Sequence, residues 1–498
     1  MKGSKFKTEL CSNDMTFNEC ELAILRHAVD ETEKISGIKQ VNNEDVKKML
    51  ILVEEFIIKH KLVCYGGTAI NNILPKYAQF YNRDIEIPDY DFYSPNALEH
   101  AKELADIFYK AGYKDVEAKA GIHYGTFKVF VNFIPIADIT YLVPRIYNII
   151  QQESIKIANI RYAPPDFLRM SMYLELSRPA GDVSRWEKVM KRSILLNKYY
   201  PMKLDKDCAR IDFYGKADKT KKSHKKTQKE EPPQNVNSVL REALIDIGVI
   251  FFGGYSTQLY SKYMSDDKRE LVNKIPDFDV LNEEPNKCAM ILKERLSKIN
   301  VTNVELVDHK PIGELIPEHV ELKVNGKSMV YIYKPIACHS YNKINIKGAS
   351  INVATIDTVL AFYLSFVYAD MPEYDTDRLM CIVMFLFDVE KRNRLAQKGI
   401  LKRFSIDCYG KQNTLSDYRS KKTEMYKKLA DKPGSDEYQM WFLKYIPHRI
   451  ESIQQKRKEK RAKTQSKSKK IAEGSQTKKK GNRLLSLLRK TRKQYFEV

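Results

Sequence analysis

The chain has 498 residues and a formal net charge of +21, and at this length we expect two large domains with accessory segments. No apolar run approaches the ~20 residues that a membrane-spanning helix needs, and the start of the chain has no signal-peptide-like segment, so we expect an intracellular, soluble protein. Residues 456–493 carry a net charge of +15 and residues 216–231 one of +4, which leaves the rest of the chain nearly neutral.

After an N-terminal segment that we expect to be helical, the first informative run is LVCYGGTAINNIL (62–74). A short apolar run that ends in Gly-Gly predicts a strand turning into a helix. Gly66 and Gly67 allow the backbone to approach a phosphate, the helix N-terminus offers it free N–H groups, and Thr68 adds a hydroxyl. A Gly-Gly turn by itself is usually no more than a turn.

The next run, IPDYDFY (87–93), alternates acidic and apolar residues, as a strand does. On a strand Asp89 and Asp91 share one face, and two carboxylates this close suit a cation such as Mg²⁺. Asp138 lies in the apolar strand IPIADITYL and needs a partner, so we expect it to complete a site for a second ion. Two ions that activate a hydroxyl and neutralise a leaving pyrophosphate indicate nucleotidyl transfer.

Helical periodicity follows the strands in both halves, over 97–111, 166–177, 184–199 and 356–369. Each half is therefore expected to be a mixed α/β unit with appended helices. The first unit also has a basic cluster on or near the 184–199 helix, formed by Arg178, Arg185, Lys188, Lys191 and Arg192. Arg178 and Lys188 are the candidates for nucleotide contact, and a solvated basic helix is an equally good interpretation.

The motifs of the first half recur in the same order in the second half, which indicates an internal duplication. The recurring pieces are GVIFFGGYSTQLY, IPDFDVL and MVYIYKPIACHSYN. Aligning PIAC with PIAD puts Cys338 in the place of Asp138, and a neutral thiol is a poor ligand for Mg²⁺. We therefore expect the second unit to be degenerate and to contribute scaffold or RNA surface.

Two basic, low-complexity segments mark the boundaries of these units. We expect an N-terminal helical segment (1–45), a catalytic domain (46–215), a basic linker (216–235), a degenerate domain (236–455) and a basic, disordered tail (456–498). The tail is interpreted either as a phosphate-binding segment that retains RNA or as a solubilising or nuclear-localisation-like run.

The eight cysteines are scattered singly along the chain, without a C-x-x-C pair. A disulfide framework or a zinc cluster normally shows closer, paired spacing. We interpret them as free, mostly buried thiols in a reducing compartment.

The order of Gly-Gly turn, Asp-x-Asp strand and third acid resembles the nucleotidyltransferase superfamily of polymerase-β type. More closely, the chain is similar to the viral poly(A) polymerase catalytic subunits of poxviruses and giant DNA viruses. The similarity covers residues 60–200 well and the second half loosely. Its motifs are CYGGTAINNILP (64–75), IPDYDFYSPNA (87–97), AGIHYGTFKVFVN (120–132), PIADITYL (135–142) and the stretch 164–197.

This resemblance implies two tandem nucleotidyltransferase-like domains and a template-independent poly(A) polymerase that adds AMP from ATP to the 3′ end of mRNA with two Mg²⁺ or Mn²⁺ ions. It also implies a place in the virion and in the viral factory of the host cytoplasm. The positions carried over are Gly66, Gly67 and Thr68 for the triphosphate and Asp89, Asp91 and Asp138 for the metals, with Asp138 on the acceptor side.

Other functions stay open at this point. The chain would also suit another terminal nucleotidyltransferase of the uridylyl-, CCA-adding or oligoadenylate type, or a non-catalytic RNA-binding module on the same fold. Expected partners are an RNA 3′ end and ATP, with no membrane. A homodimer and viral processivity, capping or transcription factors are left open.

Overall fold

The computed structural model describes residues 6, 8–41, 43–82, 88, 90–203, 207–211, 213, 235–273, 277–369, 371 and 374–449. The predicted tail and, apart from Asn235, the predicted linker lie outside these residues, and so does Asp89. Within the described part, no helix combines the length and the apolar character needed to cross a bilayer.

The first half is built on a mixed eight-stranded sheet with the order β16-β3-β4-β5-β2-β1-β7-β6. Its strands are β1 (Val63–Cys64), β2 (Tyr90–Ser94), β3 (Val116–Ala120), β4 (Thr126–Val131), β5 (Ile134–Tyr141), β6 (Ile155–Ile157), β7 (Ile160–Tyr162) and β16 (Lys444–Tyr445). The alternating sequence of β4 buries Phe127, Val129 and Val131 on one face, as the period of a strand requires.

The second half contains a sheet with the order β10-β11-β12-β9-β8-β14-β13-β15. Its strands are β8 (Ile250–Phe251), β9 (Phe278–Leu281), β10 (Val304–His309), β11 (His319–Val324), β12 (Lys327–Tyr333), β13 (His339–Ile346), β14 (Ala349–Ala354) and β15 (Cys408–Tyr409). Apart from the outer strands β16 and β15, the two sheets have the same order and the same parallel and antiparallel pairings. The mixed α/β fold class is confirmed.

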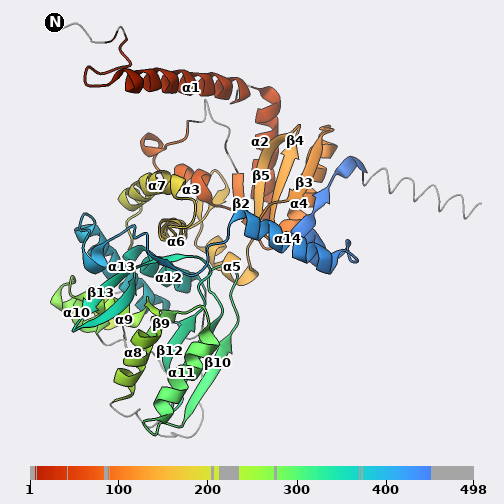
Figure 1. Ribbon diagram of the computed structural model, residues 1–498. Helices are drawn as coiled ribbons and strands as arrows, with labels where there is room; N and C mark the ends of the chain where they lie inside the picture. Colours follow the sequence, from red (N-terminus) through yellow and green to blue (C-terminus); the bar gives the residue numbers. More distant parts are fainter. Residues whose placement is uncertain are drawn as a thin grey trace, which may run out of the picture.

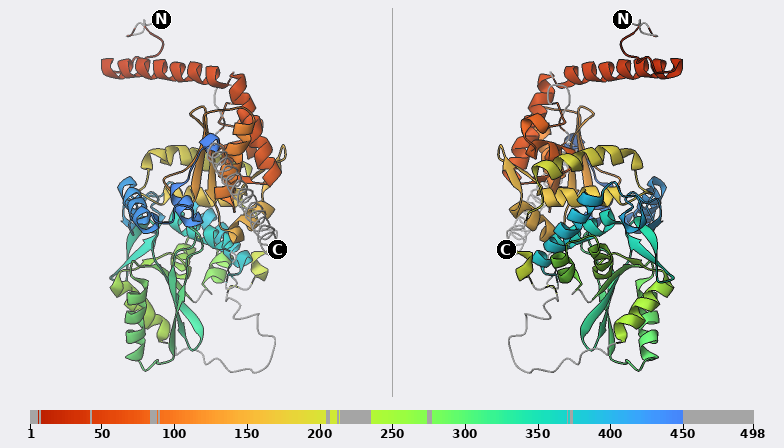
Figure 2. Two further views of the ribbon diagram at one scale, coloured as in Figure 1. Left: turned by 90° about the vertical axis from the view of Figure 1, so that its right-hand side faces the viewer. Right: turned by 90° about the vertical axis from the view of Figure 1, so that its left-hand side faces the viewer.

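Helices pack against both sheets. They are α1 (Phe17–Val41), α2 (Glu44–His60), α3 (Gly66–Ile73), α4 (Ala97–Lys110), α5 (Pro144–Gln152), α6 (Pro165–Leu176), α7 (Trp186–Tyr199), α8 (Val236–Ile247), α9 (Gly254–Ser261), α10 (Asp266–Val272), α11 (Pro285–Ser297), α12 (Ile356–Tyr368), α13 (Thr376–Asn393), α14 (Leu415–Leu429) and α15 (Asp436–Phe442). Short 3₁₀ turns are η1 (Lys76–Ala78), η2 (Val183–Arg185), η3 (Cys208–Arg210) and η4 (Gly399–Leu401). The four helices predicted from periodicity are confirmed as α4, α6, α7 and α12. Both views in Figure 2 show α1 extending away from the rest of the molecule.

The two halves meet where α6 packs against α12, between the two sheets (Figure 1). Ser340 N donates a hydrogen bond to Ser177 O at 2.8 Å, and Tyr173 OH donates to Glu390 Oε2 at 3.2 Å. The junction therefore joins helices that the sequence assigns to different units.

The chain also returns to the first sheet near its C-terminal end. β16 pairs with β3, Lys422 Nζ on α14 donates to Gly121 O at 2.6 Å, and Trp441 packs on Tyr124 with ring centroids 4.9 Å apart. The range 236–455 expected to form one domain thus contributes to both sheets. The domain boundaries stay predictions, and no spacing in the sequence indicates this return.

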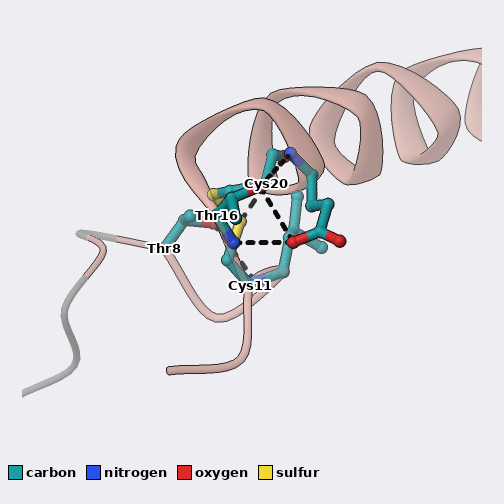
Figure 3. The surroundings of a disulfide bond; sticks show 6 residues. Thr8, Cys11, Thr16 and Cys20 are labelled. Atoms are coloured by element: carbon teal, nitrogen blue, oxygen red, sulfur yellow. Dashed lines mark hydrogen bonds between the residues drawn. A yellow bond between two sulfur atoms is a disulfide. The ribbon is translucent and has the colours of Figure 1, made fainter. Parts of the chain in front are cut away.

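The interpretation of the cysteines as free thiols is wrong for six of the eight. Disulfides join Cys11 to Cys20, Cys208 to Cys381 and Cys338 to Cys408, while Cys64 and Cys288 are free and buried. The first of these fastens the N-terminal turn to the start of α1 (Figure 3). The other two close loops of 173 and 70 residues, so only the tertiary structure brings their partners together.

Candidate active site

The Gly-Gly turn lies where β1 ends and α3 begins, as the sequence predicts. Gly66 has φ +70°, a left-handed conformation that favours glycine, and a Cβ there would lie 3.0 Å from Asp91 Oδ2. Tyr65 N donates to Asp91 O at 2.9 Å, which fixes the turn against β2. The first residues of α3 therefore begin directly beside the Asp91 carboxylate.

Gly67 is covered by an arginine from a distant helix. A Cβ at Gly67 would lie 2.8 Å from Nη2 of Arg192 and 2.5 Å from the hydroxyl of Tyr81. The Arg192 guanidinium donates to Tyr81 OH at 2.6 Å and lies over the ring of Phe80 at 5.2 Å. Its Nε is buried without a hydrogen-bond partner among the described residues. A fixed cation with a spare donor thus faces the N-terminus of α3, where the sequence predicts phosphate.

The second and third predicted acids lie side by side. β2 and β5 are parallel neighbours with Asp91 in register with Asp138, so both carboxylates project from the same face of the sheet. Lys128 lies opposite Asp138 on β4 and forms an ion pair with it. Two carboxylates and one lysine therefore meet beside the Gly-Gly turn, while the contribution of Asp89 stays a prediction.

The other residues predicted to contact the nucleotide differ in how far they are buried. Thr68 is buried in the first turn of α3. Arg178 follows α6 and is partly buried, and burial lowers its pKa to about 10 although the Glu314 carboxylate opposes the shift. Lys188 is exposed on α7, one turn before Arg192. The structure thus places Arg192, and neither Arg178 nor Lys188, against the Gly-Gly turn.

The second half reproduces this arrangement and shows which residue replaces the third acid. Phe252 N donates to Asp279 O at 3.1 Å, as Tyr65 N does to Asp91 O. β9 and β12 are parallel neighbours in which Asp279 is in register with Tyr331. Tyr331 is therefore the counterpart of Asp138.

The expected replacement by Cys338 is wrong. Cys338 follows β12 and is bonded to Cys408, away from the register position of the third acid. The match of PIAC to PIAD is a coincidence of three letters, because strand pairing and not local similarity sets the register. The second unit still lacks the third carboxylate, since Tyr331 carries a phenol whose pKa is raised by burial.

The remaining acid pair of the second half is enclosed and partly neutralised. Burial, followed by repulsion from Asp277, raises the pKa of Asp279 to about 8, while the Arg378 guanidinium attracts both carboxylates. A Cβ at Gly253 would collide with Asp279 Oδ2, so the turn and the acid are in tight contact. An acid held in its protonated form is a poor metal ligand.

This raised pKa predicts a pH dependence of stability. An unfolded aspartate ionises near 4, so between about pH 4 and pH 8 the native state holds a proton that the unfolded state releases. The stabilisation that comes from this bound proton on Asp279 is complete below pH 4 and is lost as the pH rises towards 8. Replacing Asp279 by asparagine should therefore reduce the fall in the urea unfolding midpoint between pH 5 and pH 8. An equal fall in both proteins would contradict a protonated Asp279.

Comparison with known proteins agrees with the resemblance that the sequence motifs indicate. Residues 51–182 match the family model described as poly(A) polymerase catalytic subunit. The resemblance to viral poly(A) polymerase catalytic subunits is thereby confirmed. This region contains Gly66, Gly67, Asp91 and Asp138 but ends before Arg192.

Two curated proteins and one solved structure extend the comparison. The "Putative poly(A) polymerase catalytic subunit" of African swine fever virus (strain Badajoz 1971 Vero-adapted) is 37% identical over 180 residues, which is 35% of this chain and 38% of that protein. The protein of the same name in Acanthamoeba polyphaga mimivirus is 28% identical over 327 residues, 63% of this chain and 49% of that protein. The chain thus spans less than half the length of these relatives.

The solved structure is that of the Megavirus polyadenylate synthase. It aligns with a TM-score of 0.71 and 18% identity over 90% of this chain and 89% of that one. At this identity the likeness shows the fold, and it extends over both sheets.

Lys128 and Tyr81 were not recognised from the sequence as parts of the site. Lys128 is the one basic residue in the alternating run TFKVFVNF, which is a weak signal, but only strand pairing places it opposite Asp138. Tyr81 stands in a loop without a motif. Arg192 was visible only as one member of a basic cluster.

Proposed function

We propose that this chain is a template-independent poly(A) polymerase, which transfers AMP from ATP to the 3′ end of an RNA. The observation that carries the proposal is the register of Asp91 with Asp138 directly beside the Gly-Gly turn. The family match over residues 51–182 supports the choice of reaction.

The acid set fits a hard divalent cation. Asp91 and Asp138 offer oxygen ligands on one face of neighbouring strands, the type of donor that Mg²⁺ and Mn²⁺ prefer. These residues, together with Asp89, would hold the two ions, which when bound supply Lewis acidity for phosphoryl transfer. Lys128 adds a fixed positive charge next to Asp138.

The protein's own groups then have separate tasks. Backbone N–H groups at Gly66 and Gly67 bind the triphosphate at the positive end of α3, and Arg192 binds it from the opposite side. The RNA 3′-oxygen bonds to the α-phosphorus as the bond to pyrophosphate breaks. Asp138 accepts the proton that the hydroxyl releases.

The test is extension of a short unstructured RNA with each NTP supplied singly, in Mg²⁺ or in Mn²⁺. Long products with ATP alone are expected. Preferred use of UTP would indicate a uridylyltransferase, and addition limited to a few nucleotides would indicate another terminal transferase. No incorporation of any NTP would favour the non-catalytic RNA-binding module. Homodimer formation, viral processivity or capping partners and a place in the virion or viral factory stay predictions.

The phosphate role of Arg192 predicts a specific kinetic defect. Arg192→Ala should raise the KM for ATP by roughly 10- to 100-fold, because a hydrogen bond to a charged group contributes about 1.5–3 kcal/mol. Lys188→Ala, on the same helix but exposed, should change it much less. Initial rates across ATP concentrations measure both, and the thermal midpoint of each variant checks its folding. Equal defects in the two variants would contradict the placement of Arg192.

A further inference from the structure

A cluster of metal-ligating side chains lies between two helices of the first half, outside the candidate active site. His60 is the last residue of α2, and His100 and Glu103 are one turn apart on α4. One ligand atom from each lies within 4.8 Å of the others. The centroids of the two imidazole rings are 4.5 Å apart and their planes are tilted by 53°, and His60 Nε2 is 3.0 Å from Glu103 Oε1.

A second observation shows that a hydrogen bond orients the ring of His100. His100 Nδ1 lies 2.7 Å from Oγ of Ser94, the fully buried last residue of β2. When Nδ1 carries the proton it donates to Ser94, and Nε2 keeps its lone pair for a ligand. Metal-binding histidines are commonly held in this way by a hydrogen bond from the other ring nitrogen.

We propose that His60, His100 and Glu103 form a binding site for a zinc-class divalent ion. Two imidazoles and one carboxylate, with water in the fourth position, are a donor set that suits Zn²⁺ better than Mg²⁺. The site is chemically distinct from the all-oxygen set of Asp91 and Asp138. A bound ion joins the end of α2 to α4 and, through Ser94, to the strand that carries Asp91.

Lys59 is the competitor for this site. Its Nζ lies 2.9 Å from Glu103 Oε1, and its side chain is 64% exposed, so it can turn to solvent and leave the carboxylate to a divalent ion. His60 and Glu103 are themselves partly open, at 21% and 37% exposure, which gives an ion access. Removal of the Lys59 charge should therefore strengthen metal binding.

The experiment is calorimetric titration of the chelator-treated full chain with Zn²⁺ alone. The His60→Gln/His100→Gln variant should bind one equivalent fewer than the parent. His60→Gln alone should weaken that site by at least about tenfold, and Lys59→Gln should tighten it. The Asp91→Asn/Asp138→Asn variant should keep this equivalent, which separates it from Zn²⁺ bound at the candidate active site. His27→Gln on α1 is the matched control and should change nothing.

Equal stoichiometry and affinity in the parent and the double histidine variant would overturn the proposal. His100 is partly buried, so its replacement could itself disturb folding. In that case His60→Gln and Lys59→Gln, both at the helix end, decide the question, and unchanged Zn²⁺ affinity in both would equally overturn it. A rise in the thermal midpoint with Zn²⁺ in the parent, absent in His60→Gln, is the second expected readout.

Discussion

Replacing Asp91 by asparagine should abolish adenylate extension, whereas replacing both Asp277 and Asp279 by asparagine should leave most of it. Asp91 touches the Gly-Gly turn and is in register with Asp138, so in the proposed reaction its charge would act on the ions and the triphosphate together. Loss of several kcal/mol of transition-state stabilisation corresponds to a rate reduction of at least about 10³-fold. Asp89→Asn and Asp138→Asn should have effects of similar size.

The double asparagine variant of the second unit is the matched control. It changes the same motif, but its acids face Arg378 and Tyr331 and include the protonated Asp279. Single-turnover extension of an RNA primer with saturating ATP measures both proteins, and circular dichroism verifies that both fold. If the second-unit variant were as inactive as Asp91→Asn, the assignment of one active site to the first half would be wrong.

Replacing Arg403 by methionine should lower the free energy of unfolding by about 3–5 kcal/mol. The Arg403 guanidinium binds Asp357 through two nitrogens, one of them 2.9 Å from Oδ2, and also binds Glu390. All three side chains are buried, and Tyr173 from the first half donates to the same glutamate. Methionine fills similar volume but leaves two buried carboxylates without a cation.

Urea unfolding at pH 8 and at pH 5 measures this effect. The defect should be smaller at pH 5, because burial raises the pKa of the Glu390 carboxyl, which without the arginine takes up a proton in the native state more readily as the pH falls. The exposed pair Lys334–Glu318 provides the control, and Lys334→Met should cost less than about 1 kcal/mol. Similar losses in both variants, or a larger Arg403 defect at pH 5, would contradict a buried network at the junction.

Local patterns were sufficient to predict a large part of the molecule. The periodicity that predicts α4, α6, α7 and α12 is a property of neighbouring residues, and so is the turn from strand to helix at Gly66. The recurrence of Gly-Gly and Asp-x-Asp in both halves predicted two related units, and the two sheets share their strand order. These features depend on contacts within a few residues, which a sequence displays directly.

The remaining features depend on which strands pair and which helices pack, and only the tertiary structure decides that. The register of β9 with β12 makes Tyr331 the counterpart of Asp138, although the letters around Cys338 match better. The proximity of the Arg192 side chain to Gly67 selects Arg192 from five basic candidates, and the fold joins cysteines up to 173 residues apart. By itself the sequence predicted the Gly-Gly turn and the acids that belong to it. The structure decided which residues complete that site, because register and packing are set by contacts between segments far apart in the chain.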